Sequence, residues 1–299
     1  MARALEAAAG TIYDIGYRTY EGTRLGRGYA FRTLYVHSLR SAFGLGRGGR
    51  ALLIPWALFL CMCFPAILTV AVAGISGGMI NNIIDYHEIF PFDAAMLMLF
   101  CAAQAPELMS TDQYNRVLPL YFSRALRQSD YAVAKLLAFW TAVFILVVTP
   151  LVIVFIGRIA LPVDFGAALR AESRNVLPIL GSAAAAALAM GTLAVGLAAY
   201  VPRRGIASAA VLGAFLLTAA LAASLMEMMD GEGGSKYLVL LNPILTVTGA
   251  VMGLFGERPG RGSDLRTAGL QPEAYYAAVA VYGIVFVLLL LNRYRRIRT

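Results

Sequence analysis

The sequence predicts an all-α polytopic membrane protein with six transmembrane helices. Of its 299 residues, 60% are hydrophobic and 14% are charged, whereas about a quarter of the residues in a soluble domain are charged. Several apolar runs have about 20 residues, which at 1.5 Å per helical residue is enough to cross roughly 30 Å of hydrocarbon. Basic residues gather in the segments between alternate runs, as expected on the cytoplasmic side of a membrane.

The apolar runs place the spans within a transmembrane domain of residues 51–292. They are expected at about 51–73, 90–109, 131–157, 175–200, 206–226 and 274–292. The run 90–109 is the weakest, because its uninterrupted apolar part is short and Glu107 lies near its far end. A charge at mid-bilayer costs roughly 2.5–3.5 kcal/mol on insertion scales, so Glu107 is placed at the inner boundary. The run 175–200 is rich in small residues, which predicts a helix–helix interface.

The charge distribution sets the topology. With both termini inside, the inner segments hold 18 basic and 5 acidic residues, and the outer segments hold 7 and 11. The outer segments are then Gly74 to Asp93, a polar loop from Arg158 to Arg174, and 227–272. The inner segments are 1–50, the loop 110–130, the turn 201–205 and the basic tail 293–299. This places a multi-pass protein in the cell membrane with both termini cytoplasmic. The near-exclusive use of arginine over lysine, with abundant alanine and glycine, suggests a bacterial source.

Two further elements are expected beside the spans. Residues 28–43, in the cytoplasmic N-terminal segment 1–50, have an apolar and a polar helical face, which predicts an amphipathic helix lying on the membrane surface. No secretory signal peptide is apparent before the first apolar run. The outer region 227–272 contains an apolar patch, Tyr237 to Phe255, interrupted by Asn242-Pro243. If this patch crossed the membrane, the basic tail would lie outside, so we expect re-entrant helices there.

The inner loop 110–130 is short, basic and helix-forming. Asp112 and Arg116 have the spacing of an ion pair on one helix face. Ser129 and Asp130 are candidates to cap the next helix, expected from Tyr131, and Lys135 lies at the inner end of the third span.

Several chemistries find no support in the sequence. A phosphate-binding P-loop needs a glycine followed by lysine, but the only lysines, Lys135 and Lys236, do not follow glycine. The three cysteines lie in apolar runs and the two histidines are far apart, so we expect no metal, cofactor or catalytic site in this chain. The net charge of +8 is explained by the inner membrane face and membrane lipids, so we expect no nucleic acid partner. For Glu107, a role in ion coupling competes with simple pairing to a nearby arginine.

The segment Leu120 to Lys135 (LYFSRALRQSDYAVAK) resembles the inner loop of the ABC exporter permeases called type 2 or type V. That family has a leucine, two residues, Ser-Arg-Pro, then an acidic residue with tyrosine and a lysine that opens the third span. Five residues match and Ala125 replaces the proline; the matches are Ser123, Arg124, Asp130, Tyr131 and Lys135. The tripeptide 241–243 (LNP), the helix before the first span and the six-span layout are also similar, so the resemblance covers most of the chain.

The resemblance implies a transmembrane permease subunit of an ATP-driven exporter. Such subunits pair with a second identical or paralogous permease, and they bind cytosolic ABC ATPases that hold ATP and Mg²⁺. The inner loop would be the coupling helix, and 28–43 would be the connecting helix beside it. The residues implied in coupling are Tyr121, Phe122, Ser123, Arg124, Ala125, Leu126, Arg127 and Asp130, with Glu107 and Lys135 as inner-boundary charges. The apolar spans suit a hydrophobic or amphipathic substrate.

Two other functions remain open from the sequence. One is a secondary transporter, although no inverted repeat is visible between the two halves. The other is a membrane regulatory subunit that transports nothing itself. In a secondary transporter the loop 112–130 would be an ordinary solvated connector that helps to set the topology, whereas a regulatory subunit could still bind an ATPase.

Overall fold

A computed structural model describes residues 22, 25–76, 84–123, 126–229, 233–260 and 263–296. These residues are helical almost throughout and include no strand, which confirms the all-α fold class. Arg124 and Ala125 of the predicted coupling segment lie outside the described residues, as do most residues before 25 and the last three of the tail.

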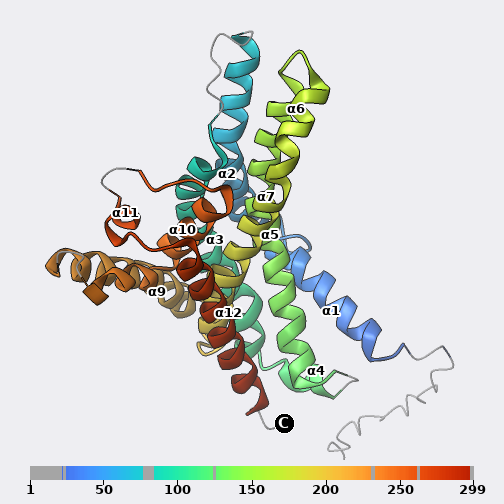
Figure 1. The fold of residues 1–299 in the computed structure, drawn as a ribbon. Coiled ribbons are helices and arrows are strands. Elements are labelled where there is room, and N and C mark those ends of the chain that lie inside the picture. The colour runs from blue at the N-terminus through green and yellow to red at the C-terminus, as the bar shows by residue number, and fades with distance from the viewer. Residues whose placement is uncertain are drawn as a thin grey trace, which may run out of the picture.

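Six helices in the described ranges are long and apolar enough to cross a membrane, as predicted. They are α2 (Arg50–Ile75), α3 (Tyr86–Tyr114), α5 (Gln128–Ala160), the run from α6 to α8 (Phe165–Ala198), α9 (Arg204–Met228) and α12 (Pro272–Arg295). Each extends past its predicted span at one or both ends, because a helix continues into polar residues beyond the apolar stretch. In Figure 1 the start of α1 (Arg27–Ala42), α4 (Leu118–Phe122) and the C-terminus lie at one end of the bundle, here called the loop end. α6 (Phe165–Glu172) lies at the opposite end.

The second span, α3, is the central helix of the bundle. It packs against α2, α5, α8 and α9 and against α10 (Pro243–Phe255). In its most apolar window 61% of the residues are buried, against 22% in α2, α9 and α12. Because α3 faces protein rather than lipid, it needs less apolar surface, which is why its sequence looked like the weakest span. Asp93, which we placed in an outer segment, lies inside α3 and is 2% exposed.

The segment 158–174, predicted as a polar loop, is mostly helical, and that prediction was wrong. α5 continues to Ala160, and after four residues α6 begins at Phe165. Its cap is Asp164, whose Oδ1 accepts from the Ala167 N–H at 3.0 Å. A short 3₁₀ turn then leads into α7 (Val176–Ala186), a π-helical turn (Ala187–Gly191) and α8 (Thr192–Ala198). The charged residues of this segment are therefore carried by helix ends.

The small residues of the fourth span lie at helix–helix contacts, as predicted. Eleven of the thirteen residues from Ala186 to Ala198 are buried, against α5 on one side and α12 on the other. A Cβ built on Gly196 would lie 2.9 Å from the Phe286 ring of α12. Close backbone approach at this contact therefore requires glycine.

The apolar patch between spans five and six forms two helices that meet at an angle of 103°. They are η3 (Gly233–Leu241) and α10. Asn242 caps α10, because its Oδ1 accepts from the Ile244 N–H at 3.0 Å, and Pro243 takes the first helical position, where its missing N–H costs nothing. The Tyr282 hydroxyl of α12 donates to the Leu241 carbonyl at 2.9 Å and holds the end of η3. The tripeptide 241–243 is thus a helix start.

The predicted amphipathic helix at 28–43 is present as α1, shifted by one residue. Its buried residues are Leu34, Ser38 and Ala42, and it packs mainly along α5. The Tyr35 hydroxyl lies 2.9 Å from Thr141 Oγ1 of α5. Part of its apolar face therefore contacts protein.

The contact between α10 and α12 gives a stability test. A Cβ on Gly249 would lie 2.6 Å from the Tyr275 ring, so Gly249→Ala should lower the melting temperature of the purified protein. Overpacking costs typically 1–3 kcal/mol, which outweighs the gain of up to ~1 kcal/mol from replacing a helical glycine. The control is Gly213→Ala in α9, where a Cβ meets nothing within 4 Å. The packing account fails if both substitutions shift the melting temperature alike.

Candidate coupling loop and the polar layer behind it

The loop between α3 and α5 is a short, partly helical connection. α3 ends at Tyr114, and Arg116 takes a left-handed backbone conformation with φ 52°. The chain then forms α4, and α5 begins at Gln128. Because Arg116 lies beyond the end of α3, the helical ion pair predicted between Asp112 and Arg116 does not form. Asp112 is instead bound to α5.

Asp112 and Lys135 form an ion pair at the base of the loop. The Lys135 Nζ lies 2.6 Å from Asp112 Oδ2 and donates to the Leu108 carbonyl at 2.6 Å. The Tyr131 hydroxyl donates to the same Asp112 oxygen at 2.7 Å. The side chains of Lys135 and Asp112 are only 7% and 18% exposed. A cation this deeply buried needs such partners, so the pair fastens the end of α3 to the start of α5.

Aromatic side chains hold α4 against the bundle. Tyr131 is fully buried, and its ring lies 5.4 Å from Tyr121, 5.9 Å from Phe122 and 5.2 Å from Tyr294 of α12, between ring centroids. Burial, and then the Asp112 carboxylate, raises the pKa of the Tyr121 hydroxyl. The aromatic face of α4 is thus directed inward.

Gln113 joins the same cluster to a fourth helix. Its Nε2 donates to the Tyr294 hydroxyl at 3.2 Å and to the Ala199 carbonyl at 2.9 Å, at the end of α8. A single side chain at the end of α3 therefore links α8 and α12 to the base of the loop.

Asp130 connects the start of α5 to the start of α1. Its Oδ2 accepts from the Arg127 N–H at 3.0 Å and from Arg27 Nε at 2.6 Å, while Oδ1 accepts from Arg27 Nη2 at 2.5 Å. This bidentate arginine–carboxylate pair is the geometry with the strongest orientation preference. The helix begins three residues earlier than expected, with Arg127 as its N-cap, so Ser129 and Asp130 lie inside α5 rather than before it. Asp130 still takes part in capping, because from the third helical position its carboxylate accepts the Arg127 N–H.

Glu107 is bound by two arginines from different elements. Arg204, at the start of α9, lies 2.6 Å from Glu107 Oε2, and Arg47, in the linker between α1 and α2, binds Oε1. The Glu107 side chain is 9% exposed. The structure therefore shows the arginine pairing that the sequence left as one alternative for this residue. We call the seven charged residues of these ion pairs the polar layer. They are Arg27, Arg47, Glu107, Asp112, Asp130, Lys135 and Arg204.

The predicted coupling residues divide into three groups. Leu126 is buried, and Tyr121 and Phe122 are half-buried against the bundle, so they anchor the loop. Ser123 and Arg127 are exposed, while Asp130 pairs with Arg27. The sequence missed two exposed side chains of the loop, Tyr114 and Leu120, at 66% and 68% exposure. A large apolar side chain in a short basic loop was the available signal for Leu120.

The arrangement makes the loop and the helix ends a connected unit. The polar layer and the aromatic contacts of Tyr131 connect six helices at the loop end of the bundle. These helices are α1, α3, α5, α8, α9 and α12. α4 therefore contacts a group of side chains that belongs to several spans. Within the described ranges, no three His, Cys, Asp or Glu side chains gather as metal ligands would.

Comparison of the chain with protein-family models and with curated proteins returned no match, so the resemblance to the type 2 exporter permeases rests on the motifs of this sequence alone.

Proposed function

We propose that this chain is the permease subunit of an ATP-driven exporter and that α4 and its flanking residues receive a push from a separate cytosolic ABC ATPase. The observation that carries the proposal is an exposed loop helix whose base is bound into the spans by the polar layer. Its motif resembles that of coupling loops in the type 2 exporter permeases. ATP and Mg²⁺ would be held by the partner ATPase.

The structure of the loop supports this function more than that of a plain connector. A connector needs only to join α3 and α5, and surface loops normally make few buried polar contacts. Here the inward side of the loop is aromatic and half-buried, and its outward side presents Leu120 and Arg127. An exposed apolar side chain beside a basic one suits docking into a protein cleft. Two-state gating of the spans by a partner then needs only a rigid connection.

The membrane placement follows from charge. In this proposal the loop end is cytoplasmic, the protein lies in a bacterial cell membrane, and both termini are inside. α1 is the interfacial connecting helix, with its exposed arginines toward anionic lipid headgroups. The bent pair η3 and α10 is re-entrant from the outer side, which keeps the tail of α12 cytoplasmic.

A second permease copy, identical or paralogous, completes the proposed transporter. α2 and α9 leave most of their apolar side chains uncovered, with only 22% of their windows buried. A path between two copies lined by such helices suits a hydrophobic or amphipathic substrate. The alternatives are a secondary transporter and a regulatory membrane subunit. Transport that survives ATP depletion would favour the first, and substrate flux that is independent of this chain would favour the second.

The first test is affinity purification of the tagged chain from its native host in mild detergent, with partners identified by mass spectrometry. We expect a protein with a P-loop in stoichiometric amount. Recovery of the chain alone, folded and monodisperse, would contradict the proposal and favour a secondary transporter.

Leu120→Asp should abolish capture of that ATPase, because it places a carboxylate in the proposed apolar contact. Leu120 is exposed, so the substitution should leave the fold and the melting temperature unchanged. The matched control is Val163→Asp, at a fully exposed residue between α5 and α6 at the opposite end. Equal capture by the two variants would remove α4 as the docking element.

A further inference from the structure

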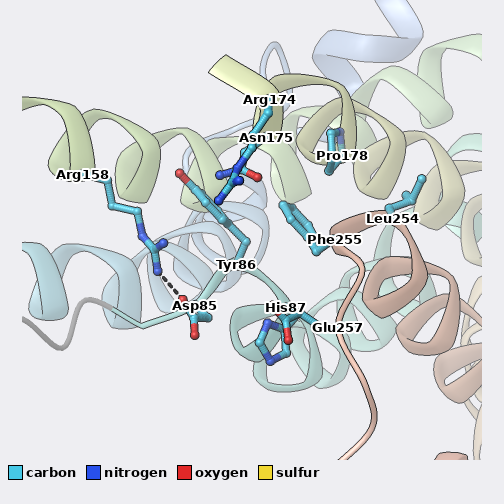
Figure 2. Close-up of a pocket in the computed structure, with 10 residues that line it drawn as sticks. All are labelled: Asp85, Tyr86, His87, Arg158, Arg174, Asn175, Pro178, Leu254, Phe255 and Glu257. Atoms are coloured by element: carbon cyan, nitrogen blue, oxygen red, sulfur yellow. Dashed lines mark hydrogen bonds and ion pairs between the residues drawn. The ribbon is translucent and has the colours of Figure 1, made fainter. Parts of the chain in front are cut away.

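The end of the bundle opposite the loop contains a polar cavity of about 470 Å³. It lies where the starts of α3 and α7 meet the ends of α5 and α10 (Figure 2). Its volume lies within the range of about 300–1,000 Å³ that is typical of small-molecule sites. Its lining includes two arginines, two carboxylates and a histidine, so the cavity is built for a charged ligand rather than an acyl chain.

One wall of the cavity is a closed network. Arg158 of α5 lies 2.5 Å from Asp85 Oδ1 and 3.9 Å from Glu172 Oε1. The Tyr86 hydroxyl and the Asn175 amide both donate to Glu172 Oε2 at 2.8 Å. These contacts fix the wall, and the dashed line in Figure 2 marks the one between Arg158 and Asp85.

Two charged groups of the lining are not used in this network. Arg174 and Glu257 make no ion pair or side-chain hydrogen bond with any residue in the described part of the chain. In Figure 2 the Arg174 side chain runs beside Asn175 toward Tyr86. Glu257 follows Gly256, whose φ of 72° ends α10 and turns the chain so that Glu257 lines the cavity. One cation and one anion without a partner among the described residues therefore line a single cavity.

We propose that this cavity binds a zwitterionic ligand that carries a phosphate and an ammonium group, as in phosphoethanolamine. Arginine binds phosphate through parallel hydrogen bonds, which assigns the phosphate to Arg174 and the ammonium to Glu257. A ligand with only a negative charge would pair with Arg174 and leave the Glu257 carboxylate without a counter-charge. A ligand with only a positive charge would pair with Glu257 and leave Arg174 without one. The proposal does not depend on the transport function, because it concerns other residues at the other end of the molecule.

Binding can be measured by calorimetry on the full chain in an uncharged maltoside detergent. The probes are phosphoethanolamine, dihexanoyl phosphatidylethanolamine, inorganic phosphate and ethanolamine. We expect phosphoethanolamine or the short-chain lipid to bind at least about tenfold more tightly than phosphate or ethanolamine. Binding of both supports the headgroup alone as ligand, and binding of the lipid only supports a lipid source. Equal or absent binding of all four probes overturns the proposal.

Paired substitutions separate the two charged groups. Arg174→Gln should weaken both phosphoethanolamine and phosphate binding about tenfold or more, whereas Glu257→Gln should weaken phosphoethanolamine binding and leave phosphate binding unchanged. The matched controls are Arg170→Gln and Glu273→Gln, exposed residues outside the cavity lining. Melting temperatures should stay at the wild-type value, because all four side chains are exposed. Wild-type affinity in both cavity variants would overturn the assignment.

Discussion

Replacing Lys135 with methionine should destabilise the protein by about 3–5 kcal/mol, the usual cost of removing one partner from a buried ion pair. The substitution removes the cation that lies 2.6 Å from Asp112 Oδ2 and leaves that carboxylate with the Tyr131 hydroxyl as its remaining donor in this cluster. It also removes the hydrogen bond to the Leu108 carbonyl. Methionine has a similar length and is apolar, so loss of side-chain volume contributes little.

A double-mutant cycle tests whether the pair itself is responsible. Asp112→Asn combined with Lys135→Met should be more stable than Lys135→Met alone, because the uncompensated buried charge is gone. Stability is measured by reversible SDS unfolding of the protein in mixed micelles. Arg116→Met is the control, since it removes an exposed cation from the same loop. If the losses of unfolding free energy in Asp112→Asn and in Lys135→Met simply add in the double variant, the ion pair does not hold α3 to α5.

The sequence predicted the spans well because each depends on a local property. An uncharged run of 23 residues at 51–73 has one stable solution in a membrane, and neighbouring elements do not change it. The break expected at Asn242-Pro243 is also local, because these residues start α10 through contacts within three residues. Capping of α5 by Asp130 is equally local.

The predictions that failed depended on contacts between helices. Asp112 and Lys135 are 23 residues apart on different helices, and no periodicity within one helix indicates that they meet. For Glu107 the pairing with arginine was one of the expected alternatives, but its partners Arg47 and Arg204 are both remote in sequence and could not be named in advance. The low hydropathy of α3 suggested a weak span, but hydropathy measures suitability for lipid, and most of α3 is buried against protein. Burial of Asp93 follows from that central position.

Reversing the charge of two loop arginines, in Arg124→Glu combined with Arg127→Glu, should abolish ATP-driven transport while the spans stay folded. The expected cause is repulsion at the proposed ATPase contact, where like charges cost affinity and register. Folding should be retained because Arg127 is exposed and the hydrogen bond from its backbone N–H to Asp130 is kept by any residue with a backbone N–H at that position. The inner segments would still carry a clear excess of basic residues, so the membrane topology should not invert.

The measurement is substrate flux and ATPase activity in proteoliposomes that contain this chain with its captured ATPase. In the variant, ATP hydrolysis should lose its dependence on substrate, and flux should fall to the level without ATP. Arg170→Glu combined with Arg258→Glu reverses the same number of exposed charges at the opposite end and leaves the cavity lining intact, so ATP-dependent flux should be retained in that control. Normal flux in the loop variant would show that α4 is an ordinary connector, and the rigid polar layer behind it would then serve only to hold the helix ends together.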